Sequence, residues 1–513
     1  MAMRAALTGQ SVINKKYQKE HIAISFNPVT REFKVQDGST RRGNQWIADI
    51  SMVMSNDFNL YNFVHDYITK NPECQPDIIS NAISELIMIK GREIGNIMLS
   101  SELSIEAVND IFIRINASGV SLSNADFAMS KIAVYEKYPG DEYGMRLRKF
   151  IDYFCNLVSD PNIYQDIVTN DENFVSTPYF DEIAWLENGT DNLFCPDYND
   201  VLRVCSLTEF ERGKLSDLVA LLSGRDFETR EYKQEIATKS FDTLASGVSK
   251  FVYRLRFEHF KQDILRAAGF IDKNDLTAKN AINYAYAMYI RAHDIGDVGA
   301  KTDSLIRRLF VLSLLTSRHS GSFETLFEHD IKMIKKPGDL DQFVVNLESQ
   351  ILTDTFWNSV LPDEFDKTNI GNQFWHLYTV AQIKLGLSSF LLKDNKVRDL
   401  TTANIHHLFS KNYLIKHGVD KKDYNKIANL VYLRDDVNFA ISDRKPADYM
   451  AKVTEFSHQF RTDITTPEQL QINFDDNAIP KMFVNATIEN YQEFLRQRQK
   501  LMASLVKRYY QSL

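Results

Sequence analysis

The chain has few cysteines and no long apolar run. Its 513 residues include only four cysteines, none in Cys-x-x-Cys spacing: Cys74, Cys155, Cys195 and Cys205. This pattern argues against a disulfide scaffold and against a zinc site, and it is typical of a reducing compartment. The longest apolar runs, such as 309–315, fall far short of the ~20 residues that a membrane-spanning helix needs. The first ten residues also lack the apolar segment of a signal peptide. We therefore expect a cytoplasmic protein with no membrane partner.

Positive charge is in deficit over the whole chain. Lys and Arg total 60 against 68 Asp and Glu, so the net charge is −8. A protein with this balance has no global basic field, and nucleic-acid binding would need local basic patches. The deficit is greatest in residues 151–200, which hold eleven acidic residues and no Lys or Arg. We interpret this acidic region as a solvated, loop-rich surface, with mimicry of DNA charge as the alternative.

What is present is the composition of an ordinary globular protein, with 44% hydrophobic and 25% charged residues. The length predicts two to four domains. Residues 21–27 and 31–36 alternate like two strands around a turn, which predicts a β-hairpin. The apolar residues recur with helical period from residue 59 onward, notably over 78–91 and 104–116, and again over 206–350. Aromatic residues at helical spacing in 251–289 indicate a helical core, with base stacking as the alternative. The fold class expected is therefore α+β and predominantly helical.

The most informative stretch is 402–449. It contains the adjacent pair His406–His407 in a β-like run, then Asn429 before an apolar run, and then Asn438. The order predicts a strand, a loop, a second strand and a helix. A neutral imidazole can take a proton from water near pH 7, and a hard ion such as Mg²⁺ needs only one or two protein ligands. We therefore predict that His407 is a general base that Asn429 orients. His406 and Asn438 would be ligands of Mg²⁺ or another divalent ion such as Mn²⁺.

This stretch resembles a known family. The segments HHLF, IANLVYL and VNFAISDRKPADYM are similar in order and type to the C-terminal HNH-type nuclease domain of GmrSD modification-dependent restriction endonucleases. There the pattern is His-His-Ile-Phe-Pro, an Ala-Asn strand, and a helix start of the form Lys-Pro-x-x-Tyr. Two residues depart from it: Ser410 replaces the usual proline, and Asn404 replaces a frequent acidic residue. The resemblance implies a ββα-metal (HNH-like) module.

A second resemblance lies at 112–123. Its residues Phe112, Arg114, Asn116, Gly119 and Leu122-Ser123 by themselves indicate a polar turn before a new helix, with Ser123 as its N-cap. The turn could hold a phosphate or serve only the fold. The pattern is similar to the second motif of the GmrSD N-terminal domain, which resembles ParB and sulfiredoxin and acts on nucleotides or DNA. The family's first motif, Asp-Gly-Gln-Gln-Arg, does not occur in this chain. We therefore expect a truncated nucleotide site that retains Arg114 and Asn116, with a nucleoside triphosphate as cofactor only of an intact form.

These expectations define an architecture. We predict a truncated ParB-like α/β part over 1–140, a central helical domain over 141–375, an HNH-like nuclease domain over 376–460 and a basic helical tail over 461–513. The segment 374–392 is predicted as one strongly apolar helix. Four basic residues would contact the DNA backbone near the nuclease domain and along the tail: Lys445, Lys500, Lys507 and Arg508.

The function expected is that of a metal-dependent DNA endonuclease in a GmrSD-like phage-defence system of type IV restriction. Its partner would be DNA, with base-modified phage DNA as the substrate that the family implies, and a homo-oligomer is left open. The alternative is a catalytically inactive nucleic-acid-binding or regulatory protein that keeps the fold. A third hypothesis, a nucleotide hydrolase acting through the N-terminal part, is disfavoured by the missing motif.

Overall fold

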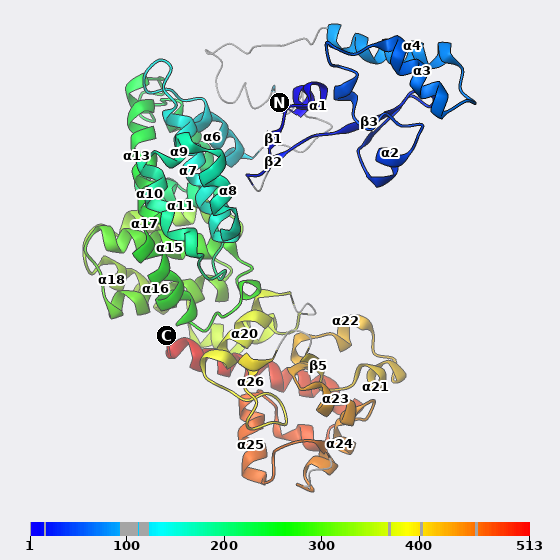
Figure 1. Cartoon of the computed structure of the whole chain (residues 1–513). Coiled ribbons are helices and arrows are strands. Elements are labelled where there is room, and N and C mark those ends of the chain that lie inside the picture. The colour runs from blue at the N-terminus through cyan, green and yellow to red at the C-terminus, as the bar shows by residue number, and fades with distance from the viewer. Residues whose placement is uncertain are drawn as a thin grey trace. The chain divides into compact units, whose positions relative to one another are not determined.

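The computed structural model describes residues 2–14, 17–92, 111, 123–367, 371–400, 404–456 and 460–513. The chain divides into two compact units (Figure 1). The first unit comprises residues 1–121 and 160–180, and the second comprises 122–159 and 181–513. Helices dominate, and the strands of the described residues form three two-stranded antiparallel sheets. The expected helix-rich α+β class is confirmed. Among these residues, no helix combines the length and apolar character needed to span a bilayer.

The first unit holds the predicted hairpin. Strand β3 (Ile24–Asn27) pairs antiparallel with β4 (Glu32–Val35), and the short strands β1 (Val12–Ile13) and β2 (Lys19–Glu20) form a second pair. The helices around them are α1 (Ala2–Thr8), α2 (Gly38–Arg42), α3 (Leu60–Lys70) and α4 (Pro76–Met88). Buried apolar residues of β3, α3 and α4 make one core with Ile47, Ile50, Val53 and Met54. The predicted phosphate residues Arg114 and Asn116 lie outside the described residues.

The acidic stretch 151–200, predicted as loop-rich, contains several short helices. They are α8 (Tyr164–Asn170), α9 (Glu172–Val175) and α10 (Pro178–Ile183). Several of its carboxylates cap helix N-termini. Asp160 accepts a hydrogen bond from the backbone N–H of Asn162, Asp171 from that of Phe174, and Asp197 from those of Asn199 and Asp200. Part of this negative charge therefore serves helix ends.

The second unit begins with a helical body. Helix α6 (Asn124–Ala133) has the predicted N-cap, Ser123, which forms a capping box with Asp126. The body continues with α7 (Tyr143–Ser159), α11 (Tyr198–Phe210), α12 (Leu215–Leu222), α13 (Gln234–Val252), α14 (Arg254–His259), the π-helix η5 (Phe260–Arg266), α15 (Lys279–Asp294), α16 (Ala300–Leu315), α17 (Phe323–Met333) and α18 (Asp339–Ile351). Most of the aromatic residues predicted as core are buried and pack ring against ring, for example Phe251 on Tyr286 at 4.9 Å. Tyr253 is the exception: it lies between α13 and α14 and is half exposed.

The rest of the second unit contains the π-helix η7 (Phe356–Val360), α19 (Leu361–Glu364), α20 (Gln373–Lys384), α21 (Lys411–Lys416), α22 (Lys421–Tyr424), α23 (Asp435–Ile441), α24 (Pro446–Val453), α25 (Pro467–Asp476) and α26 (Tyr491–Gln511). The apolar helix predicted over 374–392 is too long. It ends at Lys384, because Gly386 takes φ +66° and the backbone N–H groups of Ser388 and Leu391 donate to Asp476 and Asn473 of α25 instead. Helix α26, predicted within a tail, buries Phe494, Met502 and Tyr509 in the core.

Candidate functional site

The stretch 404–441 folds as strand, connection, strand and helix. Strand β5 (Ile405–His407) pairs antiparallel with β6 (Leu430–Tyr432), with His406 opposite Val431 and His407 opposite Leu430. Helix α23 follows β6 after a short turn (Figure 1). The predicted element order is present. The connection between the strands differs from the expected loop, because it contains the helices α21 and α22.

The β5–β6 strand pair packs against a buried aromatic cluster. Phe409, directly after β5, packs against Phe483, Tyr491 and Phe494 with ring centroids 4.9–5.8 Å apart. The buried hydroxyl of Tyr449 donates a hydrogen bond to the carbonyl of Leu408 at 2.9 Å. These contacts fix the end of β5 from one side and leave both histidines only partly buried.

His407 is held by Asn425. Its Nε2 lies 3.0 Å from the amide oxygen Oδ1 of Asn425. An amide oxygen only accepts, so Nε2 carries the proton and the other ring nitrogen, Nδ1, keeps its lone pair. No hydrogen bond to Nδ1 is found from the described residues. Burial lowers the pKa of the His407 imidazole, and the Asn425 hydrogen bond opposes that shift. A neutral ring with a free Nδ1 is the state of a general base.

The prediction that Asn429 orients His407 is wrong, because the Asn429 side chain bonds to backbone groups instead. Its Oδ1 accepts a hydrogen bond from the backbone N–H of Phe409 at 2.9 Å, and its Nδ2 donates to the carbonyls of Phe409 and Tyr424. Asn429 is fully buried, and both its amide oxygen and its amide nitrogen bond to backbone groups. It therefore forms no hydrogen bond with His407. It anchors the connection to β5, while Asn425 orients the imidazole. Sequence reasoning missed Asn425 because two asparagines lie four residues apart and nothing in their spacing distinguishes them.

His406 faces helix α23. Its Nε2 lies 3.0 Å from Oδ1 of Asp435, the first residue of the helix, whose side chain is 58% exposed. Asn438 lies three residues further on, so Asp435 and Asn438 share one face of α23. No hydrogen bond from the described residues reaches the side chain of Asn438, which is half-buried. Sequence reasoning named His406 and Asn438 but missed Asp435. Its position one helical turn before Asn438 could have indicated it.

The carboxylate of the next residue, Asp436, forms an ion pair with Arg434 and not with His406. Arg434 donates to both oxygens of Asp436, at 2.6 and 3.0 Å, and this ion pair lowers the pKa of the Asp436 carboxyl. Asp436 is thereby neutralised. Asp435 is the acidic group of this turn that remains beside His406.

The donor set at this corner fits a hard divalent ion. An imidazole nitrogen, a carboxylate oxygen and a carboxamide oxygen come from His406, Asp435 and Asn438, and Mg²⁺ is commonly held by one or two protein ligands and several waters. Within the part of the chain that the structure describes, no group of three or more His, Cys, Asp or Glu side chains could hold a metal ion. A divalent ion held here would therefore need the amide of Asn438 and water molecules to complete its coordination.

The four basic residues predicted to contact the DNA backbone lie in different surroundings. Lys445 precedes α24, with its Nζ 3.5 Å from the carboxylate of Asp448. Lys500 and Arg508 are exposed on α26. Lys507 lies 3.8 Å from Asp354 and lines a cavity of about 680 Å³ together with Arg308 and Trp357. None of the three α26 residues forms a hydrogen bond or an ion pair with described residues of β5, β6 or α23.

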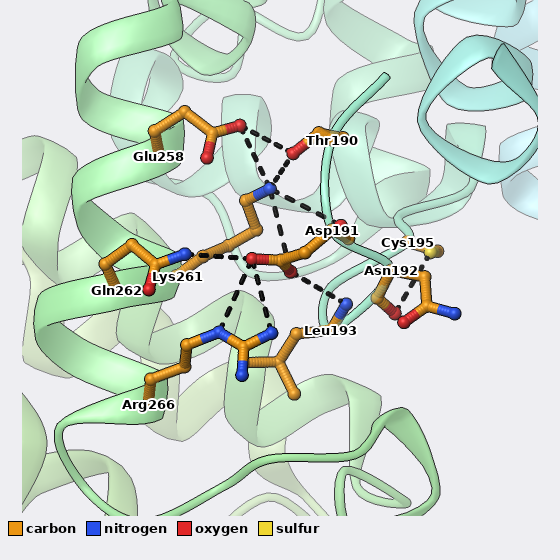
Figure 2. A network of polar contacts seen from close by, with 9 residues as sticks. All are labelled: Thr190, Asp191, Asn192, Leu193, Cys195, Glu258, Lys261, Gln262 and Arg266. Carbon is orange, nitrogen blue, oxygen red and sulfur yellow. Dashed lines mark hydrogen bonds and ion pairs between the residues drawn. The ribbon is translucent and has the colours of Figure 1, made fainter. Parts of the chain in front are cut away.

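A second polar cluster surrounds Lys261 on the π-helix η5 (Figure 2). The Lys261 side chain is 0% exposed, and its Nζ contacts Glu258 at 3.0 Å, the hydroxyl of Thr190 and the carbonyl of Asp191. The carboxylate of Asp191 in turn accepts from Gln262 at 2.9 Å and from Arg266 at 3.4 Å. Each charge in this network has a partner. The cluster therefore ties the 190–195 segment to η5 and offers no free group for chemistry.

Comparison of the chain with protein-family models, with curated proteins and with solved structures finds no significant match.

Proposed function

We propose that the β5–β6–α23 corner is the active site of a metal-dependent DNA endonuclease, with a ββα-metal (HNH-like) arrangement of the kind that GmrSD restriction enzymes have. The observation that carries the proposal is the state of His407. Its Nε2–H is fixed on Asn425, its Nδ1 receives no hydrogen bond from the described residues, and its neighbour His406 turns to the carboxylate of Asp435 on α23. Adjacent residues of a strand project from opposite faces, so the proposal requires one phosphodiester to reach both His407 and the ligands on the His406 side of β5.

In this mechanism Nδ1 of His407 takes a proton from a water molecule as the water oxygen attacks phosphorus. A bond forms between that oxygen and phosphorus, the bond from phosphorus to the leaving sugar oxygen breaks, and the leaving oxygen takes a proton from solvent. The Nε2–H bond to Asn425 persists throughout and stabilises the imidazolium that forms. His406, Asp435 and Asn438 would hold the divalent ion, which supplies charge neutralisation at the phosphate and leaving oxygen.

Nicking of supercoiled plasmid in Mg²⁺ or Mn²⁺ tests the proposal. His407→Ala should lower the rate by about 10²- to 10⁴-fold, the usual contribution of a general base. The matched control is His417→Ala: this exposed imidazole donates its Nδ1–H to the carbonyl of Tyr413 and should be dispensable. Substrates with and without base modification should be compared, since the family resemblance implies modified DNA. Equal rates for wild type and His407→Ala would refute the endonuclease.

The second candidate is an inactive nucleic-acid-binding or regulatory protein. Asn404 and Ser410, which replace the acidic residue and the proline of the family pattern, favour it. Such a protein would bind DNA with a strong salt dependence and would cut under no divalent ion. The predicted N-terminal nucleotide site remains a proposal, because Arg114 and Asn116 lie outside the described residues. A nucleotide requirement for cleavage would support it.

A further inference from the structure

Helix α26 presents two buried hydrogen-bond donors, Tyr491 and Arg498, to the connection between β5 and β6. They are seven residues apart on the helix, so they lie on one face, two turns from each other. Their exposed fractions are 1% and 0%. Phe494 lies between them on the same face and packs against Phe409, with ring centroids 5.1 Å apart. One face of α26 therefore supports the end of β5 and carries two polar groups beside that contact.

These two donors bond to backbone carbonyls on either side of Asn425. The hydroxyl of Tyr491 donates to the carbonyl of Asp423 at 2.8 Å. Nη1 of Arg498 donates to the carbonyl of Ala428, also at 2.8 Å. Asp423 precedes Asn425 by two residues, and Ala428 follows it by three. Burial raises the pKa of the Tyr491 hydroxyl, which therefore keeps its proton and remains a donor. One helix thus holds both ends of the segment that carries Asn425.

A third contact reaches Lys426, the residue directly after Asn425. Its Nζ donates to both carboxylate oxygens of Asp366, at 2.6 and 2.8 Å. The Oδ1 of that carboxylate also accepts a hydrogen bond from Nε2 of Gln499 on α26, at 2.9 Å. The Lys426 side chain is only 15% exposed. Helix α26 is therefore connected to the segment 423–428 at three points.

Arg498 is a buried cation that forms no ion pair with a carboxylate of the described residues. Besides the carbonyl of Ala428, it donates from Nη2 to the carbonyl of Asn477 at 3.3 Å, and its Nε has no hydrogen-bond partner. An apolar side chain of similar volume would cost the fold less than such a cation. Stability alone therefore does not account for arginine at this position. What the guanidinium adds is a fixed place for two backbone carbonyls.

From these contacts we infer that Tyr491 and Arg498 are positioning residues of the candidate site. They hold the segment 423–428 so that Oδ1 of Asn425 stays within hydrogen-bond distance of Nε2 of His407. The inference rests on the proposed function for its effect on catalysis. A catalytic group displaced by about 1 Å can lower a rate by about 10²-fold, so the 3.0 Å contact between Asn425 and His407 needs a rigid support. Because the two residues act on the base and not on DNA, they should affect kcat and leave KM unchanged.

The test measures how fast the Nε2–H proton of His407 exchanges with water in the full chain labelled with ¹⁵N-histidine. The hydrogen bond to Asn425 slows this exchange, and His407→Ala identifies the signal by its loss. Tyr491→Phe removes only a hydroxyl and should speed the exchange about tenfold, the usual effect of one lost hydrogen bond. It should also lower kcat for plasmid nicking about tenfold at unchanged KM.

The matched control is Tyr509→Phe. Tyr509 is an equally buried tyrosine of α26, and its hydroxyl donates to the carbonyl of Ala268 at 2.7 Å, away from the candidate site. In urea denaturation this variant should lose about as much stability as Tyr491→Phe, because each loses one buried hydrogen bond to a carbonyl. Its proton exchange at His407 and its kcat should equal those of the wild type.

Two variants of Arg498 give an independent measurement. Arg498→Met keeps a similar volume without donors and should speed the exchange as Tyr491→Phe does. Arg498→Lys keeps the charge and can reach one carbonyl, so its exchange rate should fall between those of the methionine variant and the wild type. Wild-type exchange in both Tyr491→Phe and Arg498→Met would overturn the positioning role. An equal increase in Tyr509→Phe would also overturn it, because general loosening of α26 would then explain the effect.

These outcomes are separate from the fate of the endonuclease, because proton exchange is measured without DNA. If nicking depends on His407 while Tyr491→Phe exchanges and cuts like the wild type, the endonuclease stands and the positioning role falls. If no divalent ion supports nicking but the exchange still depends on Tyr491, the positioning of Asn425 stands in a protein that does not cut DNA.

Discussion

Two polar clusters of the second unit, around Lys261 and around His407, differ in how completely their groups are paired. At Lys261 the buried ammonium has Glu258 and Thr190, and every charge around it is matched. At His407 one ring nitrogen is bonded and the other is open, and the amide of Asn438 is unused among the described residues. A saturated network stabilises a fold, whereas reaction chemistry needs groups left open toward solvent.

The largest expected effect that would test this comparison is a loss of stability in a Lys261 variant. Lys261→Ala should lower the free energy of unfolding by about 3–5 kcal/mol, because it leaves the carboxylates of Glu258 and Asp191 without their buried cation. Urea denaturation of the full chain measures the change. The control is Lys301→Ala, whose exposed ion pair with Asp341 at 2.7 Å should contribute about 0–1 kcal/mol. Equal losses for the two variants would mean that the Lys261 network is no more than a surface pair.

The second largest loss of stability is expected for Asn429→Ala. The substitution strands the backbone N–H and carbonyl of Phe409 in a buried environment, so the free energy of unfolding should fall by about 1–3 kcal/mol. Plasmid nicking should fall as well, since the connection that carries Asn425 loses its anchor. Asn412→Ala, on the exposed side of α21, is the comparison variant and should keep full stability. A stable Asn429→Ala protein would contradict the anchoring role.

Asn425→Ala should act on the reaction and barely on stability. Removing the hydrogen bond that opposes burial should lower the pKa of His407 further. A base must be neutral, so activity is lost as pH falls through this pKa. The acidic limb of the pH–rate profile should therefore move to lower pH, while the plateau rate drops about tenfold because the ring is no longer oriented. Asn425→Asp should move that limb the opposite way. An unmoved limb in both variants would show that His407 does not set the profile.

Local patterns in the sequence predicted the short-range features. The alternation of 21–27 and 31–36 predicted the β3–β4 hairpin, and the polar turn before Ser123 predicted the N-terminus of α6. The order of His407, the apolar run after Asn429 and the polar turn predicted β5, β6 and α23. Each of these depends on backbone preferences and side-chain periods over a few residues. The prediction of a helix reaching residue 392 was wrong, because the end of that helix depends on residues distant in the chain. Apolar composition continued past Lys384, but Gly386 and hydrogen bonds from distant Asn473 ended the helix.

By itself, therefore, the sequence determined a helix-rich α+β chain, the place of its hairpins and the two histidines on which the candidate site depends. Only the tertiary structure decided which asparagine holds His407 and that Asp435 joins His406. The reason is that hydrogen-bond partners are selected by distance and direction among residues 18 to 29 positions apart. Spacing along the chain constrains neither, whereas the packing of β5 between α23 and the Phe409 cluster fixes both.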